Sequence, residues 1–259
     1  MKAAFRLSVE EIAVALTLIG KPELGHDLLV TQSGAAPGQD EVRSRLLAAA
    51  HSLISRGWLA VTPEGTVGLA DSLARVARVL AQADFSIRYS RSYRDAEMLL
   101  TYHFVQGGIF EHRLEQGVVH SITELEDAAA VVQGGLNFFE MAQLPTFSFP
   151  PLDVPGSLLD EIKDADDPKS VSDRLTDYGV ARETADVLAE DLADTEYRGS
   201  ASRVEYDAND TPTADRGFLL LHGQQRSWIL RPFDRQGTPF VTLMPGTADA
   251  FSREVAALL

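Results

Sequence analysis

The sequence predicts an α+β fold made of antiparallel β-meanders with packed helices, in two similar halves related by a pseudo-two-fold axis. Apolar residues recur with a period near 3.6 in some segments and near 2 in others, which are the periods of helices and strands. Short glycine-containing turns separate the strand-like segments, as in antiparallel meanders. The same order of segments also occurs twice along the 259 residues, of which 45% are apolar, enough for a hydrophobic core.

The chain opens with a strand followed by a helix. Residues 3–7 alternate weakly between apolar and polar side chains, so we expect a short strand there. Ser8, with Glu11 three residues later, forms a capping-box pattern that predicts a helix from Val9. Gly20, followed by Pro22, is expected to end this helix.

Two further helices are expected before the first meander. Apolar residues recur at helical spacing over 42–54, and Gly57 is well placed as the C-terminal stop. A second set of apolar residues at helical spacing follows the turn at 63–65 and extends over 69–80. Because each helix has a broad apolar face, we expect the two to pack together.

A meander of strands follows, with turns at 106–108 and 115–117. Its alternating segments lie at 85–89, 98–105, 109–114 and 118–122. Ser121 and Glu124 form a second possible capping box, so a helix over 121–136 is expected to close this half.

The second half repeats this order. We expect a strand at 146–149, helices starting near 155, 171 and 184, a second meander, and a closing helix at 247–258. Three sheet segments align with the first half at near-equal offsets: Arg203–Tyr206 with Ser86–Tyr89, Leu220–His222 with Thr101–His103, and the turn Arg235–Gly237 with Glu115–Gly117. We therefore predict an internal duplication, with residues 1–142 and 143–259 as the two halves of one domain. The alternative is that two generic α+β segments align through their composition.

The composition restricts the classes of function. The net charge of −15 repels nucleic acid and anionic lipid on average. The absence of cysteine excludes disulfides, thiolate metal sites and a cysteine nucleophile. No apolar run is long enough to cross a bilayer and the start does not resemble a signal peptide, so we expect a cytoplasmic protein. Residues 153–196 carry fourteen acidic and four basic side chains, which form either a solvated helical face or a surface that steers a partner.

No recognisable catalytic, metal or cofactor motif is present. His103, His112 and His120 fall on three successive expected strands and could converge on a metal, but no carboxylate stands at a known ligand spacing, so we expect no metal site. Gly107-Gly108 and Gly134-Gly135 are interpreted as a hairpin turn and a helix end rather than as phosphate-binding loops. We expect no enzymatic activity and no cofactor.

A winged-helix DNA-binding regulator is the alternative from another class. Residues 42–55 would form the recognition helix and 58–69 the hairpin wing. The charges are unfavourable for DNA binding, because Glu41 accompanies Arg43 and Arg45 on the helix and Glu64 occupies the wing tip.

One expected loop, Ser90–Glu97, has a composition favoured in recognition surfaces, with arginines and a tyrosine close together. The candidate partner-binding residues are therefore Ser90, Arg91, Ser92, Tyr93 and Arg94. An ordinary solvated connection between strands is the alternative interpretation.

The order of segments resembles the EspG-type chaperones of type VII (ESX) secretion systems. The resemblance rests on the opening strand and helix, on the glycine-ended helix at Leu53–Leu59, and on the helix leading into a strand at Leu73–Ile87. It implies a cytosolic, non-enzymatic chaperone that keeps a helical PE/PPE-like secretion substrate soluble by holding its apolar tip. In that family the loop between the second and third strands and the C-terminal helices contact the client. By position these are Ser90–Glu97 and helices within Val171–Ala193.

Overall fold

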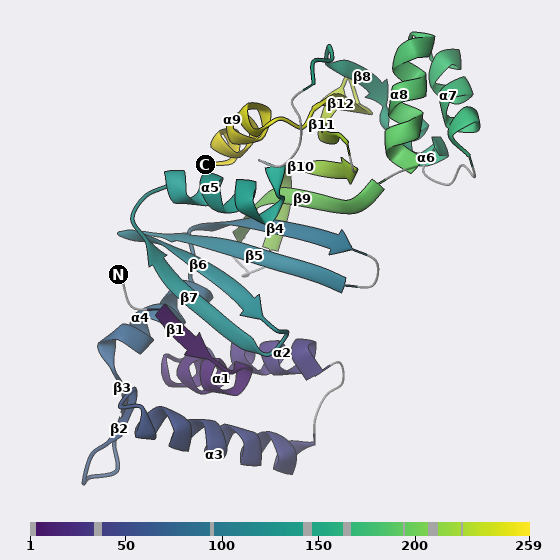
Figure 1. Cartoon of the computed structure of the whole chain (residues 1–259). Coiled ribbons are helices and arrows are strands. Elements are labelled where there is room, and N and C mark those ends of the chain that lie inside the picture. The colour runs from purple at the N-terminus through teal and green to yellow at the C-terminus, as the bar shows by residue number, and fades with distance from the viewer. Residues whose placement is uncertain are drawn as a thin grey trace. The chain divides into compact units, whose positions relative to one another are not determined.

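The chain folds as two compact units (Figure 1). The computed structural model describes residues 4–33, 38–93, 96–141, 147–162, 167–193, 195–206, 212–223 and 225–259. Unit 1 comprises Met1–Ser86 and Thr101–Asp127, and unit 2 comprises Ile87–Leu100 and Ala128–Leu259. Strands β4 (Phe85–Tyr93) and β5 (Ala96–Val105) contribute residues to both units. The two repeated halves expected from the sequence, residues 1–142 and 143–259, are a different division of the chain from these two units. That internal repeat stays a prediction.

Unit 1 begins with strand β1 (Ala4–Leu7) and helix α1 (Val9–Leu18), as expected. The capping box is confirmed: the Glu11 backbone N–H donates to the Ser8 hydroxyl over 3.2 Å, and the Ser8 backbone N–H donates to the Glu11 carboxylate over 3.0 Å. A further helix, α2 (Pro22–Ser33), then follows where none was expected. Pro22 begins this helix because a proline in the first turn has no N–H that needs a partner.

The next elements of unit 1 are helix α3 (Gln39–Ser55), strands β2 (Leu59–Val61) and β3 (Val67–Leu69), and helix α4 (Asp71–Ala81). Strands β2 and β3 pair antiparallel in a small separate sheet. The second expected helix therefore begins at Asp71 rather than near Leu69.

The main sheet of unit 1 has the strand order β1-β7-β6-β5, with β6 at Gly108–Glu115 and β7 at Val119–Leu125. Phe5 pairs with Ile122, and Ile122 pairs with His112, so these three side chains share one face of the sheet. The core packs on this face. Its large buried members are Phe5, Leu7, Ile12, Leu16, Leu53, Leu59, Leu73, Val76, Val79, Phe110 and Ile122.

The helix expected over 121–136 is wrong in its first part. Residues 121–125 belong to β7, because Ile122 lies between β1 and β6 in the sheet and is fully buried. The helix, α5 (Ala129–Phe138), starts later and belongs to unit 2. Gly134 and Gly135 therefore lie inside a helix and not at its end.

Unit 2 contains a longer run of elements. After α5 come β8 (Leu152–Pro155), α6 (Gly156–Ile162), α7 (Pro168–Asp177), α8 (Arg182–Ala193), β9 (Thr195–Tyr206), β10 (Pro212–Gly223), β11 (Ser227–Arg235), β12 (Thr238–Pro245) and α9 (Ala248–Leu258). The strand order in this unit is β5-β4-β9-β10-β11-β12-β8. The strand expected at 146–149 is not found: residues 147–149 have no regular structure, and Thr146 lies outside the described residues.

The α+β class with antiparallel meanders is confirmed. In chain order, strand and helices precede a four-strand meander and a closing helix twice. The two hairpin turns that were aligned in the sequence also share a conformation. Gln116 and Gly117 have φ of 52° and 72°, and Gln236 and Gly237 have 55° and 82°, so each pair lies in the left-handed region favoured by tight hairpins. The pseudo-two-fold relation itself stays a prediction.

Candidate partner-binding surface

The expected loop at Ser90–Glu97 is mostly strand. Strand β4 continues to Tyr93 and β5 begins at Ala96, so the segment is the end of a hairpin in unit 2. Arg94 lies outside the described residues. Ser92 and Tyr93 are exposed, whereas the Ser90 hydroxyl is hydrogen-bonded to the Ser200 hydroxyl of β9 over 2.8 Å.

The Arg91 side chain contacts other residues of unit 2. Its guanidinium forms an ion pair of 2.8 Å with Glu140, and its Nε donates to the Met98 sulfur over 3.3 Å. The guanidinium carbon also lies 5.3 Å from the ring centroid of Tyr197. Only 18% of the Arg91 side chain is exposed. We therefore assign Arg91 to holding the hairpin, which leaves Tyr93 as the better candidate for a contact.

The hairpin end exposes large side chains, of which only Tyr93 was among the candidates from the sequence. All four residues of Ala96–Leu99 are exposed, although successive residues of a strand point to opposite faces. Both faces are therefore uncovered here. Tyr93, Met98 and Leu99 are each more than 40% exposed.

A pocket of about 520 Å³ lies in unit 2 between the helices α6 to α8 and the strands β9 to β11. Twelve of its fifteen lining residues are uncharged, and most of these are apolar: Leu159, Ile162, Pro168, Val171, Ala189, Leu192, Ala193, Gly199, Leu219, Leu220, Leu221 and Leu230. Leu219 is 51% exposed although it lies in the middle of β10. An apolar hollow with an exposed leucine is typical of a surface that another molecule covers.

Strand β9 connects the pocket to the hairpin. Arg198 and Gly199 of β9 line the pocket, and the next residue, Ser200, bonds to Ser90 of β4. A side chain in place of Gly199 would clash, because its Cβ would lie 2.6 Å from the Phe139 ring. The pocket wall and the base of the hairpin are thus adjacent within unit 2.

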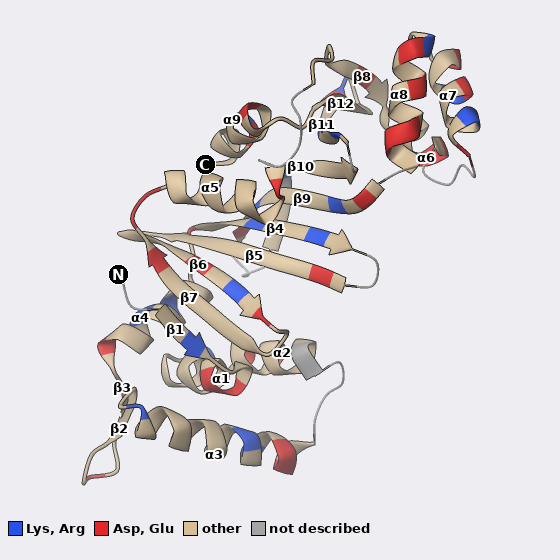
Figure 2. Cartoon of the chain, in the orientation of Figure 1, with Lys and Arg blue, Asp and Glu red and all other residues tan. Residues whose placement is uncertain are grey.

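The pocket rim carries charges of both signs. Asp160 and Asp167 lie on the α6–α7 side and Arg198 lies on β9. Acidic residues are frequent along α8, whereas α7 carries both acidic and basic residues (Figure 2). One of the acidic groups of α8, Asp191, faces inward and accepts hydrogen bonds from Arg226 and from the Trp228 indole over 2.7 to 3.0 Å. It therefore stabilises the unit instead of contributing to the rim.

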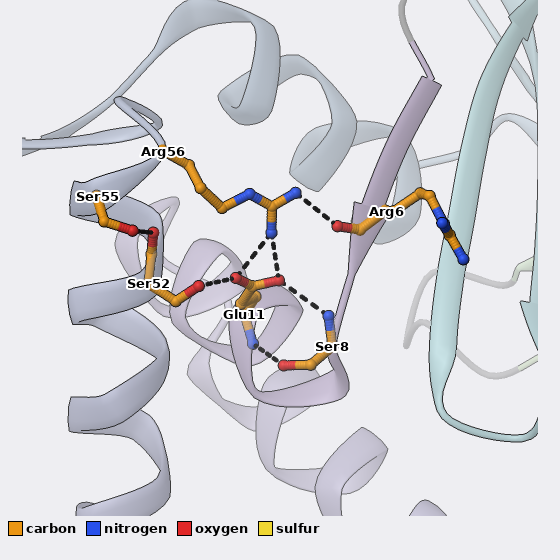
Figure 3. Close-up of polar contacts among 6 residues, drawn as sticks. All are labelled: Arg6, Ser8, Glu11, Ser52, Ser55 and Arg56. Atoms are coloured by element: carbon orange, nitrogen blue, oxygen red, sulfur yellow. Dashed lines mark hydrogen bonds and ion pairs between the residues drawn. The ribbon is translucent and has the colours of Figure 1, made fainter.

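A buried carboxylate in unit 1, that of Glu11, has a structural role. Glu11 accepts hydrogen bonds from Ser8, Ser52 and Arg56, and Arg56 also donates to the Arg6 carbonyl (Figure 3). Only 6% of the Glu11 side chain is exposed. The cluster joins α1, α3 and β1, and both carboxylate oxygens are occupied by these donors.

The three histidines of the first meander are close together but do not converge on one point. Their rings form a line, with His112 between His103 and His120. Within the described ranges, no group of three or more His, Asp or Glu side chains is arranged to hold a metal ion.

The wing expected for a DNA-binding domain does form, as the β2–β3 hairpin after α3. Two of the three arginines of α3 and its C-terminal end are paired with carboxylates, however. Arg45 forms an ion pair of 2.6 Å with Glu10, and Arg56 forms one of 2.9 Å with Glu11 while its guanidinium stacks on Trp58 at 3.6 Å. The face lacks the basic stripe that DNA binding requires.

Comparison with known proteins places the chain in a family. The family described as "Uncharacterised protein YfjC" matches residues 5–239. The chain belongs to the YfjC family. Among curated proteins, none matches this YfjC-family chain.

Among solved structures, one similar chain comes from the Mycobacterium tuberculosis type VII secretion system chaperone EspG5, in complex with a PE25-PPE41 dimer. The TM-score is 0.70 at 13% sequence identity, and the match covers 99% of the YfjC-family chain and 95% of the other. This likeness shows the fold. Within its described residues, the YfjC-family chain has no helix long and apolar enough to cross a membrane.

Proposed function

We propose that this protein is a non-enzymatic chaperone or adaptor that binds a helical protein client through unit 2. The observation that supports the proposal most strongly is the apolar pocket between α6 to α8 and β9 to β11, with Leu219 half-exposed in its wall. The exposed hairpin end, with Tyr93, Met98 and Leu99, adds further exposed apolar side chains in the same unit. The likeness in fold to a type VII secretion chaperone supports a PE/PPE-like secreted protein as the client and the cytoplasm as the compartment.

The size and chemistry of the pocket suit a few side chains from one helix end. A volume of about 520 Å³ lies in the range of small binding pockets, and a leucine buried from water contributes about 1.5 to 3 kcal/mol. Two or three such side chains contribute about 3 to 9 kcal/mol in total, which is less than a micromolar complex needs once the cost of association is included, so the client must also make contacts outside the pocket. The exposed acidic side chains of α7 and α8 favour solubility of the unbound chaperone.

Site-specific cross-linking tests the proposal. A photo-reactive amino acid replaces Leu219 in the full chain, which is expressed in its own host and irradiated. The matched control carries the same group at Leu47, which is 58% exposed on α3 of unit 1. We expect a helical secreted protein to be cross-linked at position 219 and not at 47.

Affinity for the identified client gives the quantitative test. Leu219→Lys removes about half or more of a buried leucine's contribution and places a charge at the pocket, so we expect the Kd to rise at least about tenfold. Leu47→Lys should leave the Kd within about twofold. Equal effects of the two substitutions on the Kd would overturn the proposal. Cross-links to chromosomal DNA from position 47 alone would also overturn it and would favour the winged-helix alternative.

A further inference from the structure

One wall of the apolar pocket in unit 2 is a face of the sheet. Arg198 of β9 pairs with Leu221 of β10. Leu219, two residues before Leu221, pairs with Ser200 of β9 and with Leu230 of β11. Directly paired residues point to the same side of a sheet, and so do residues two apart along a strand. These side chains therefore form two neighbouring rows on one face, and all of them except Ser200 line the pocket.

The positive charge on this wall is not used within the protein. Arg198 is exposed, and among the described residues no carboxylate forms an ion pair or a hydrogen bond with its guanidinium. Other arginines of unit 2 differ: Arg226 is paired with Asp191 and Arg91 with Glu140, each at 2.8 Å. The N–H donors of a guanidinium match the two oxygens of a carboxylate. Arg198 is therefore available, at the edge of an apolar pocket, to bind a carboxylate of another molecule.

The helical side of the pocket has the opposite charge. Asp160 of α6 and Asp167, which precedes α7, line the pocket there. Hydrogen bonds from Ser170 lower the pKa of Asp167, so its carboxylate is ionised at neutral pH. An acidic group of a client is thus repelled on the α6–α7 side and attracted towards β9. The charges favour one orientation of a charged client in the pocket.

The spacing of the two rows on the sheet matches one turn of a helix. Residues two apart on a strand are separated by about 6 to 7 Å. Side chains three or four residues apart on a helix are separated by about 5 to 6 Å. A client helix that places an apolar side chain against Leu219 can therefore bring the side chain one turn away to the row of Arg198.

We propose that Arg198 binds a carboxylate of the client, carried by an Asp or Glu three or four residues from the apolar side chain that packs on Leu219. This inference rests on the proposed function, because it specifies the chemistry of the helix that the pocket receives. The apolar side chain contributes most of the affinity. The carboxylate determines which end of the client helix lies over β9.

Synthetic helical peptides test this inference on the full chain. Three peptides share two leucines on one face and differ only at the position four residues from the second leucine, which is Glu, Gln or Lys. Binding is followed through the methyl NMR signals of Leu219. An ion pair at a rim that remains partly in water changes affinity modestly, so we expect the Glu peptide to bind about two- to fivefold more tightly than the Gln peptide. The Lys peptide should bind most weakly.

Reversal of the charge gives the decisive comparison. In Arg198→Glu the order of affinities should reverse, so that the Lys peptide binds most tightly. The matched control is Arg253→Glu, because Arg253 is an exposed arginine of α9 in the same unit and does not line the pocket. This control should keep the natural order. An unchanged order of affinities in Arg198→Glu would refute the role of Arg198.

The outcomes separate this inference from the proposed function. If the three peptides bind the natural chain equally, and Leu219→Lys weakens all three, the pocket receives apolar side chains but Arg198 does not select a carboxylate. That result overturns the inference and leaves the proposed function standing. If no peptide changes the Leu219 signals, both the inference and the assignment of the pocket as the client site are overturned.

Discussion

The ion pair between Glu11 and Arg56 should stabilise unit 1 far more than an exposed ion pair of similar length. The Glu11 carboxylate accepts two contacts from Arg56 Nη1, at 2.9 and 3.0 Å, one from the Ser52 hydroxyl at 2.7 Å and one from the Ser8 backbone N–H at 3.0 Å. Glu11→Ala removes all of them and the capping box. Breaking a buried pair costs about 3 to 5 kcal/mol, and we expect the lower end, about 3 kcal/mol, because Arg56 is 34% exposed and can turn to water.

A double-mutant cycle isolates the pair itself. Unfolding in urea, followed by Trp58 fluorescence, is measured for Glu11→Ala, Arg56→Ala and the double variant. We expect a coupling free energy of about 2 kcal/mol. The matched control is the pair of Asp173 and Arg182, which is 2.6 Å long with both side chains about half exposed, and there we expect less than about 1 kcal/mol.

The comparison of the two cycles decides whether burial sets the strength of these pairs. Equal coupling at the two sites would refute the reasoning, because the buried pair is the longer of the two. If Glu11→Ala greatly lowers the free energy of unfolding but shows no coupling free energy with Arg56→Ala, the stabilisation comes from the helix cap and from the bond to Ser52 instead.

Three further predictions concern unit 2. Gly135→Ala should lower the free energy of unfolding by about 1 to 3 kcal/mol in a urea titration, because the added Cβ would lie 2.7 Å from the Phe251 ring. Burial lowers the pKa of His222 in the folded protein despite nearby carboxylates. The stability that neutral His222 contributes is therefore complete above its unfolded pKa, near 6.5, and is lost as the pH falls below that value. The melting temperature of His222→Phe should accordingly depend less on pH between 7 and 5 than that of the natural chain. Arg91→Ala should increase hydrogen exchange at Met98 and Leu99, whereas Arg88→Ala, at an exposed position of the same strand, should not.

Local patterns were sufficient to predict much of the fold. The capping box at Ser8 and the period-2 meanders depend on neighbours in sequence, and they formed as expected. The two Gln-Gly turns were predicted for the same reason. In each of these cases the decisive interaction spans only a few residues.

The predictions were wrong where a residue distant in sequence determines the local structure. Ser121 and Glu124 have the spacing of a capping box, but the segment is a strand because Phe5 of β1 pairs with Ile122. Gly135 was interpreted as a helix end, whereas it lies within α5, where Phe251 and Tyr89 leave no space for a side chain. Neither partner can be identified from the local sequence.

The candidate site was predicted only in outline. The segment at Ser90–Tyr93 was identified by its composition, but the inward turn of Arg91 depends on Glu140 and Tyr197, which are distant in sequence. Runs of apolar residues at Met98–Leu100 and Leu219–Leu221 contain both buried and exposed members. Hydropathy alone cannot distinguish them, so the pocket was not predicted.

The bond between Ser90 and Ser200 has a consequence for how the chain is made. Its two hydroxyls are separated by 110 residues, so β4 leaves the ribosome long before the strand that it will lie beside. At a translation rate of about 5 to 20 residues per second, roughly 5 to 20 seconds separate the synthesis of the β4–β5 hairpin from that of β9. During that interval its apolar edge has no partner from its own unit, and slow translation of this stretch should increase the share of nascent chains that aggregate or recruit a folding helper.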